Sequence, residues 1–122
     1  MSRAAHRRGV LVVCAAALAA SASMFGPSLA GAQEVSPGQA LAFDRSKGNC
    51  LACHTMKGGD VPSNVGPALA DMRARFPDPK ALAAIIYDEE SRNPQTVMPA
   101  FGKNMILSDQ EIQQVVAYLY TL

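Results

Sequence analysis

The feature that most constrains this chain is the segment Cys-Leu-Ala-Cys-His, which runs from Cys50 through Cys53 to His54. It places two thiols and an imidazole on a single turn of backbone. A thioredoxin-like redox pair would need a strand–helix–strand context, which the surrounding sequence lacks. A zinc site needs four ligands. Beyond position 32 the chain has no other cysteine or histidine, so zinc would have to recruit carboxylates. A disulfide across this short loop is the plainest alternative.

The same segment is the signature of c-type haem attachment. Two thiols at this spacing reach the two vinyl-derived carbons on one edge of a porphyrin. The adjacent imidazole then points at the iron from the same turn. We therefore expect one covalently attached haem c, held through Cys50 and Cys53, with His54 as an iron ligand.

The 122 residues allow one small domain, preceded by a segment with the layout of an export signal. Residues 1–32 combine a basic start, a short apolar run and an Ala-x-Ala pattern, which predicts a cleaved secretory signal peptide and a periplasmic protein. Cleavage is expected after Ala32, with Ala30 as the close alternative. The apolar run is much shorter than the roughly 20 residues of a spanning helix. Cys14 lies inside that run, which fits a discarded residue better than a lipidated one.

The remaining domain, residues 33–122, has 90 residues, and its eight basic and ten acidic side chains give a net charge of −2. This balance argues against a nucleic-acid partner, because neutralising phosphates needs clustered positive charge. A domain of this size has a small core and often needs a covalent or metal staple. A covalently held porphyrin would supply the missing apolar bulk.

The sequence predicts an all-α domain of about four helices and long loops, with no convincing strand. Ser-Pro and Asp-Pro pairs at Ser36-Pro37 and Asp78-Pro79 have the cap and first-turn residues of helix starts. The expected helices run from Pro37 to a stop at Gly48, over 69–76, from Pro79 to near Tyr87, and from Ser108 onward. Residues 55–67 and 88–104 are predicted loops, and the acidic run 88–90 is expected to be solvated.

The last helix has the clearest pattern. Ser108 and Glu111 form a capping-box sequence. Apolar residues then repeat at helical spacing, at Ile112, Val115, Val116 and Leu119.

Methionine is the best remaining donor for a second axial iron ligand, because His6 would leave with the signal. The candidates are Met56, Met72, Met98 and Met105. Met56 is too close to His54 to reach the opposite haem face, and Met72 fits the apolar side of its own helix. Met98 lies 44 residues after His54, in a loop stiffened by Pro99, and is the preferred ligand. Met105 remains as the alternative. Filled axial positions favour electron transfer over small-molecule binding.

The pair Gly66-Pro67 is predicted to orient His54. A ligating histidine usually donates its other ring N–H to a carbonyl or carboxylate. Pro67 can offer its carbonyl, while Gly66 lets the backbone approach the ring. An ordinary turn is the alternative interpretation.

Together these features resemble the class I cytochrome c family: Cys-x-x-Cys-His after one helix, then Gly-Pro, Met-Pro and a C-terminal helix. The resemblance extends to the monohaem X subunit of the sulfur-oxidising (Sox) cytochrome complex. It rests on the segments 42–50, 58–67, 75–78 and 93–102 and covers nearly all of residues 41–122. Ala100 stands where that subunit is expected to have a second proline.

This resemblance implies a class I cytochrome c fold in which the first and last helices cross, with Phe43 and Tyr118 as expected contact residues. It also implies a heterodimer with a larger Sox A subunit. That subunit would carry the catalysis, an L-cysteine S-thiosulfotransferase reaction that joins thiosulfate to a cysteine of a carrier protein. The present chain would relay electrons to a soluble acceptor and contribute no catalytic residue.

Two other functions remain open. A free-standing cytochrome that shuttles electrons between respiratory complexes would need the same haem site. A haem-based sensor would need an open or labile axial position, against which Met98 argues.

Overall fold

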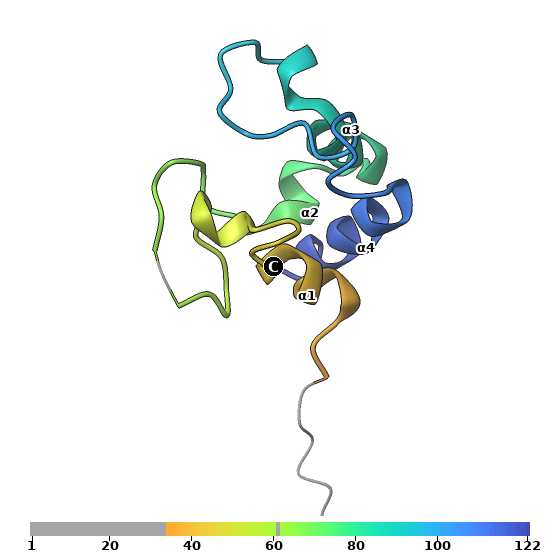
Figure 1. Cartoon of the computed structure of the whole chain (residues 1–122). Coiled ribbons are helices and arrows are strands. Elements are labelled where there is room, and N and C mark those ends of the chain that lie inside the picture. The colour runs from red at the N-terminus through yellow and green to blue at the C-terminus, as the bar shows by residue number, and fades with distance from the viewer. Residues whose placement is uncertain (1–33, 61) are drawn as a thin grey trace, which may run out of the picture. The chain divides into compact units, whose positions relative to one another are not determined.

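The computed structural model describes residues 34–60 and 62–122, and the chain order of its helices is seen in Figure 1. The elements are α1 (Pro37–Phe43), η1 (Cys50–Ala52), α2 (Met72–Arg75), α3 (Pro79–Asp88), η2 (Glu89–Ser91) and α4 (Asp109–Leu119). Within the described residues there is no strand, only an isolated bridge between Met56 and Leu69. The predicted all-α fold is confirmed. The predicted signal peptide, with Cys14 and both cleavage sites, lies outside the described residues.

In the described ranges, the structure contains no helix with the length and apolar character needed to cross a membrane.

The helix starts follow from local capping chemistry, as the sequence predicts. The Ser36 hydroxyl accepts from the backbone N–H of Gln39 at 3.2 Å, and Pro37 follows it in the first turn. The Asp78 carboxylate accepts from the N–H of Lys80 at 2.9 Å. At α4, Ser108 and Glu111 cap each other's backbone, so the predicted capping box is confirmed. Each such cap contributes about 1 kcal/mol.

Helices α1 and α4 cross at close range (Figure 1). At Gly38 a Cβ atom would lie 1.9 Å from the Gln114 carbonyl oxygen, so only glycine permits this approach. Next to the crossing, the rings of Phe43 and Tyr118 meet edge to face, with centroids 6.0 Å apart. The predicted contact between these two residues is confirmed.

The apolar face of α4 forms the centre of the core. Ile112, Val115, Val116 and Leu119 are each at most 3% exposed, as their spacing predicts. Met72 from α2 and Leu82 from α3 belong to the same buried cluster. Fully burying a side chain of this size stabilises the fold by about 1.5–3 kcal/mol. Helices α1 and α3 therefore pack mainly against α4.

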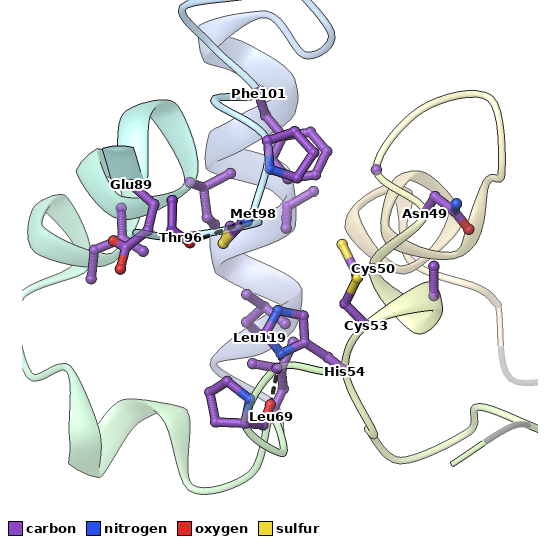
Figure 2. Close-up of a pocket in the computed structure, with 18 of the residues that line it drawn as sticks. Asn49, Cys50, Cys53, His54, Leu69, Glu89, Thr96, Met98, Phe101 and Leu119 are labelled. Carbon is purple, nitrogen blue, oxygen red and sulfur yellow. Dashed lines mark hydrogen bonds between the residues drawn. The ribbon is translucent and has the colours of Figure 1, made fainter. Parts of the chain in front are cut away.

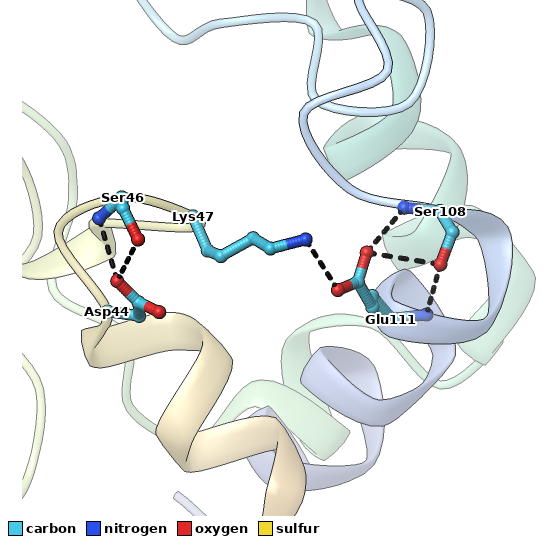
Figure 3. Close-up of polar contacts among 5 residues, drawn as sticks. All are labelled: Asp44, Ser46, Lys47, Ser108 and Glu111. Carbon is cyan, nitrogen blue, oxygen red and sulfur yellow. Dashed lines mark hydrogen bonds and ion pairs between the residues drawn. The ribbon is translucent and has the colours of Figure 1, made fainter.

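The first helix is shorter than predicted. It ends at Phe43, because Asp44 has extended backbone and its carboxylate accepts from both the N–H and the hydroxyl of Ser46 (Figure 3). Gly48, the predicted stop, lies in the following turn. There its N–H donates to the Leu41 carbonyl at 3.1 Å.

The prediction of a solvated acidic run at 88–90 is wrong for two of its three residues. Asp88 ends α3 and Glu89 begins η2, so part of the predicted loop is helical. Glu89 is only 6% exposed, and it pairs with Arg92. Asp88 is also largely covered and pairs with Lys103 at 3.1 Å. Local ion pairs offset the cost of burying these carboxylates.

Candidate haem site

A cavity of about 710 Å³ lies among α2, α3, α4 and the two long loops. All six predicted site residues line it: Cys50, Cys53, His54, Gly66, Pro67 and Met98. Its size falls within the ~300–1,000 Å³ of sites that hold small ligands and cofactors. Figure 2 shows Cys50 and Cys53 on one side of this cavity and Met98 on the other.

The two cysteines and His54 are positioned by a tight local turn. The η1 turn begins at Cys50, and the Cys50 carbonyl accepts from the N–H groups of Cys53 and His54, at 3.2 and 2.9 Å. Both cysteines are free thiols. Burial raises the pKa of the Cys50 thiol to about 11. A thiol with so high a pKa is a poor nucleophile at neutral pH, unlike a catalytic thioredoxin-type cysteine.

The imidazole of His54 has one possible tautomer in this arrangement. Its Nδ1 lies 2.7 Å from the Pro67 carbonyl oxygen. A carbonyl can only accept, so Nδ1 carries the proton and donates it to this bond. The lone pair of Nε2 is then available for a metal ion. The hydrogen bond predicted from the Gly-Pro pair is therefore present.

Gly66 makes this orientation sterically possible. Its N–H donates to the Cys53 carbonyl at 2.7 Å, which brings the backbone directly against the imidazole. A Cβ atom on Gly66 would lie 2.4 Å from Cε1 of His54, far inside contact distance. The close approach predicted for Gly66 is confirmed.

Met98 lies in a loop that is bound to the end of α3. Its N–H donates to the Thr96 hydroxyl at 3.1 Å (Figure 2). The residues that follow attach to the end of α3: the N–H of Phe101 donates to Ile86 and that of Gly102 to Tyr87. These bonds place the partly buried Met98 in the cavity wall.

The other methionines are less suited to ligate a metal in this cavity. Met56 is buried in the core and does not line the cavity. Met72 lines it, but its sulfur lies 3.4 Å from the Arg75 guanidinium. Met105, the alternative ligand, is 89% exposed and does not line the cavity.

The donor set fits a covalently attached porphyrin. Two thiols, an imidazole with a free Nε2 and a thioether border one largely apolar cavity, which suits the two attachment points and two axial ligands of a haem c. In the part of the chain that the structure describes, no three His, Cys, Asp or Glu side chains gather as a metal-binding group. The residues present thus fit a haem better than zinc.

Comparison with known proteins identifies the family. Residues 35–122 match the family model for cytochrome c. This chain belongs to the cytochrome c family. Members of this family bind haem c covalently, in agreement with the Cys-x-x-Cys-His segment and the cavity beside it.

A relative of this cytochrome c is an uncharacterised lipoprotein from Aquifex aeolicus (strain VF5), 38% identical over 78 residues. The match covers 61% of the present chain and 36% of the relative, so it spans about a third of that protein's length.

Several polar residues of the cavity were not predicted from the sequence, among them Glu89, Arg92 and Thr96. The first two form an ion pair at i, i+3 spacing. Their spacing in the sequence is typical of a helical ion pair. The prediction of a solvated acidic run at 88–90 does not include such a pair. Thr96 gives no signal in sequence, because a threonine two residues before a methionine is common in loops.

Proposed function

We propose that this cytochrome c is the electron-relay subunit of a periplasmic complex of the Sox type, which oxidises thiosulfate. The observation that carries electron transfer is the pair of donors in one cavity, His54 with its free Nε2 and Met98. With both donors bound to its iron, a haem held in this cavity would offer no binding site for a substrate, and the chemistry that it would supply is transfer of an electron.

A bound haem c would supply reversible one-electron oxidation and reduction. The chain's own residues do the rest. Cys50 and Cys53 would hold the porphyrin edge, and Pro67 keeps His54 in the ligating tautomer. Met98 would be the second protein ligand of the iron, which would raise the reduction potential relative to histidine alone.

The assignment to a Sox-type complex rests on the sequence resemblance. Two of the segments that carry it, 58–67 and 93–102, contain Gly66, Pro67, Thr96 and Met98 of the cavity wall. In this proposal a larger A subunit joins thiosulfate to a carrier-protein cysteine. One proton leaves the cysteine thiol and two electrons leave the sulfur atoms as the S–S bond forms. The present chain passes those electrons singly to a soluble acceptor.

Catalysis is assigned to the partner because the cavity of this chain offers no acid–base pair. Among the described residues that line it, the one histidine, His54, is oriented for ligation by Pro67. Its carboxylate, Glu89, is paired with Arg92. Neither group is free to exchange a proton with a substrate.

Export to the periplasm is part of the proposal. It is supported by the signal-like residues 1–32, and haem attachment to Cys-x-x-Cys-His is expected outside the cytoplasm. The relative's description as a lipoprotein is compatible with an exported protein.

The experiment that tests the proposal is a pull-down of the C-terminally tagged chain from periplasm of its source grown on thiosulfate. Partners and the mass of the chain are read by mass spectrometry, with an untagged strain and thiosulfate-free growth as controls. We expect a stoichiometric larger haem protein, and this chain heavier by one haem. Recovery of a haem-bearing chain alone would sink the Sox assignment and favour a free electron shuttle.

A further inference from the structure

A buried carboxylate faces the same cavity as the proposed axial ligands. Among the described residues, Glu89 is the one buried polar or charged residue, at 6% exposed. It lines the cavity, and Figure 2 shows it on the side of Thr96 and Met98, across from Cys50 and Cys53. Burial of an ionised carboxylate is costly unless it is paired, so the way Glu89 is paired decides what charge it presents to the cavity.

The partner of Glu89 is Arg92, which binds both carboxylate oxygens. Nε of Arg92 donates to Oε2 at 2.9 Å, and Nη2 donates to Oε1. The two side chains differ in their exposure: that of Glu89 is 8% exposed and that of Arg92 65%. Water therefore screens the positive charge much more than the negative charge. The pair is neutral in sum, and Arg92 also lines the cavity; because its charge is the better screened of the two, we expect the pair to contribute a net negative field there.

We infer that Glu89 lowers the reduction potential of this cytochrome by stabilising its oxidised state. The inference deepens the electron-transfer function and rests on it. Loss of one electron leaves a haem iron with one more positive charge, and a fixed negative charge in the cavity wall favours that state. At an effective dielectric constant of ~20, a unit charge about 10 Å away changes such an equilibrium on the order of tenfold.

A purely structural role for Glu89 makes a different prediction. The Glu89 carbonyl also accepts from the N–H groups of Arg92 and Asn93, at 3.1 and 2.8 Å. Glu89 could thus act only by shaping the loop that leads to Met98. If that role were lost, the protein would be less stable, or Met98 would be displaced and the reduction potential would fall. If only the negative charge were lost, the reduction potential would rise.

The chain offers a matched control in the next residue. Glu90 has a 52% exposed side chain and does not line the cavity. Glu90→Gln therefore removes the same charge from the same segment, at a site screened by water. Arg92→Gln removes the opposite charge, and Arg92→Lys retains it.

The test is a potentiometric titration of the full chain, exported and loaded with haem, followed by absorbance. Glu89→Gln should shift the redox equilibrium toward the reduced state on the order of tenfold. This corresponds to a rise in reduction potential of about 59 mV for one electron. Glu90→Gln should give less than about a third of that shift. Arg92→Gln should lower the potential and Arg92→Lys should restore it, with the methionine–iron absorbance band unchanged in every variant.

Two results would overturn the inference. The first is a Glu89→Gln shift no larger than that of Glu90→Gln, and the second is a fall in potential with loss of the methionine–iron band. Should Glu89→Gln fail to fold, Arg92→Gln decides, because its side chain is mostly exposed: an unchanged or raised potential refutes the inference. A redox-active wild type with unresponsive variants refutes only this inference. A wild type without redox-active haem refutes electron transfer as well.

Discussion

The two sides of the cavity are built in different ways. The His54 side is made within one stretch, from Cys50 to Pro67, by bonds between residues at most 13 positions apart. The Met98 side depends on α3, whose end binds the loop through Ile86 and Tyr87, and on ion pairs with Glu89 and Asp88. One side is made within a single loop, and the other joins a loop to the helix that precedes it.

This difference has a consequence for how each side responds to change. The His54 side has an imidazole that is hydrogen bonded at 2.7 Å and packed against backbone, so it has little room to adjust. The Met98 side has a flexible thioether and partly exposed supporting side chains, such as Tyr87, which can move. We expect small steric changes to be costly at the first side and tolerated at the second.

The largest effect is expected from removal of the proposed ligand on the Met98 side. Met98→Ala should lower the reduction potential on the order of 0.2 V, a fraction of the ~0.8 V range that axial ligands set. Potentiometry and binding of added cyanide measure the effect. Met105→Ala is the matched control, since Met105 is 89% exposed and outside the cavity. A large shift in Met105→Ala, with none in Met98→Ala, would reassign the ligand.

On the His54 side, Gly66→Ala should destabilise the protein by about 3 kcal/mol, because its Cβ would lie 2.4 Å from the imidazole. Denaturant unfolding measures this, and the fraction of chain that acquires haem reports on the site. Gly59→Ala is the control: its close neighbour is the flexible end of Leu51, which can turn away. We expect a cost under about 1 kcal/mol there. Equal costs for the two variants would contradict the rigid picture of the His54 side.

The corresponding change on the Met98 side is Gly102→Ala, whose Cβ would lie 2.0 Å from the Tyr87 ring. Although this overlap is more severe, the ring is 44% exposed and can swing toward solvent. We expect a cost of only about 1 kcal/mol and a small change in reduction potential, measured by unfolding and potentiometry. A cost above that of Gly66→Ala would reverse the comparison between the two sides.

The smallest effect is expected away from both sides, at the contact that joins the loop after α1 to α4 (Figure 3). The backbone N–H of Ser108 and the Lys47 ammonium lower the pKa of Glu111 from 4.5 to about 2. A lowered carboxyl pKa stabilises the fold above its unfolded value and loses that contribution as the pH falls through the folded value. Glu111→Gln should therefore be less stable than wild type at pH 7.

The two proteins should converge in melting temperature between pH about 4.5 and pH about 2. Thermal unfolding across that range measures the difference. Lys47→Met, which leaves the contacts of Glu111 with Ser108 in place, should give a smaller change than Glu111→Gln. Parallel curves for wild type and Glu111→Gln would show that this carboxylate does not contribute.

Interactions between residues close together in the sequence determine much of this protein, and the features that depend on them can be predicted without the structure. The haem-attachment segment, the helix starts at Ser36 and Asp78, and the capping box at Ser108 each depend on residues a few positions apart. The apolar spacing of α4 predicts its buried face for the same reason. The hydrogen bond from His54 to Pro67 could also be predicted from the sequence, because Gly66 and Pro67 follow His54 by 12 and 13 residues, within the same loop.

The sequence already favours Met98 as the ligand, whereas the tertiary structure decides where each methionine lies. Four methionines were chemically able to ligate, and their separation into cavity, core and surface depends on contacts with α3 and α4. The burial of Glu89 has the same origin. Whether an acidic residue in a polar run is solvated depends on which other segment covers it. In this fold the ion pair with Arg92 offsets the cost of burying the Glu89 carboxylate in the cavity wall. Local patterns specify which groups a turn presents, whereas packing between distant segments decides which of them face the cavity.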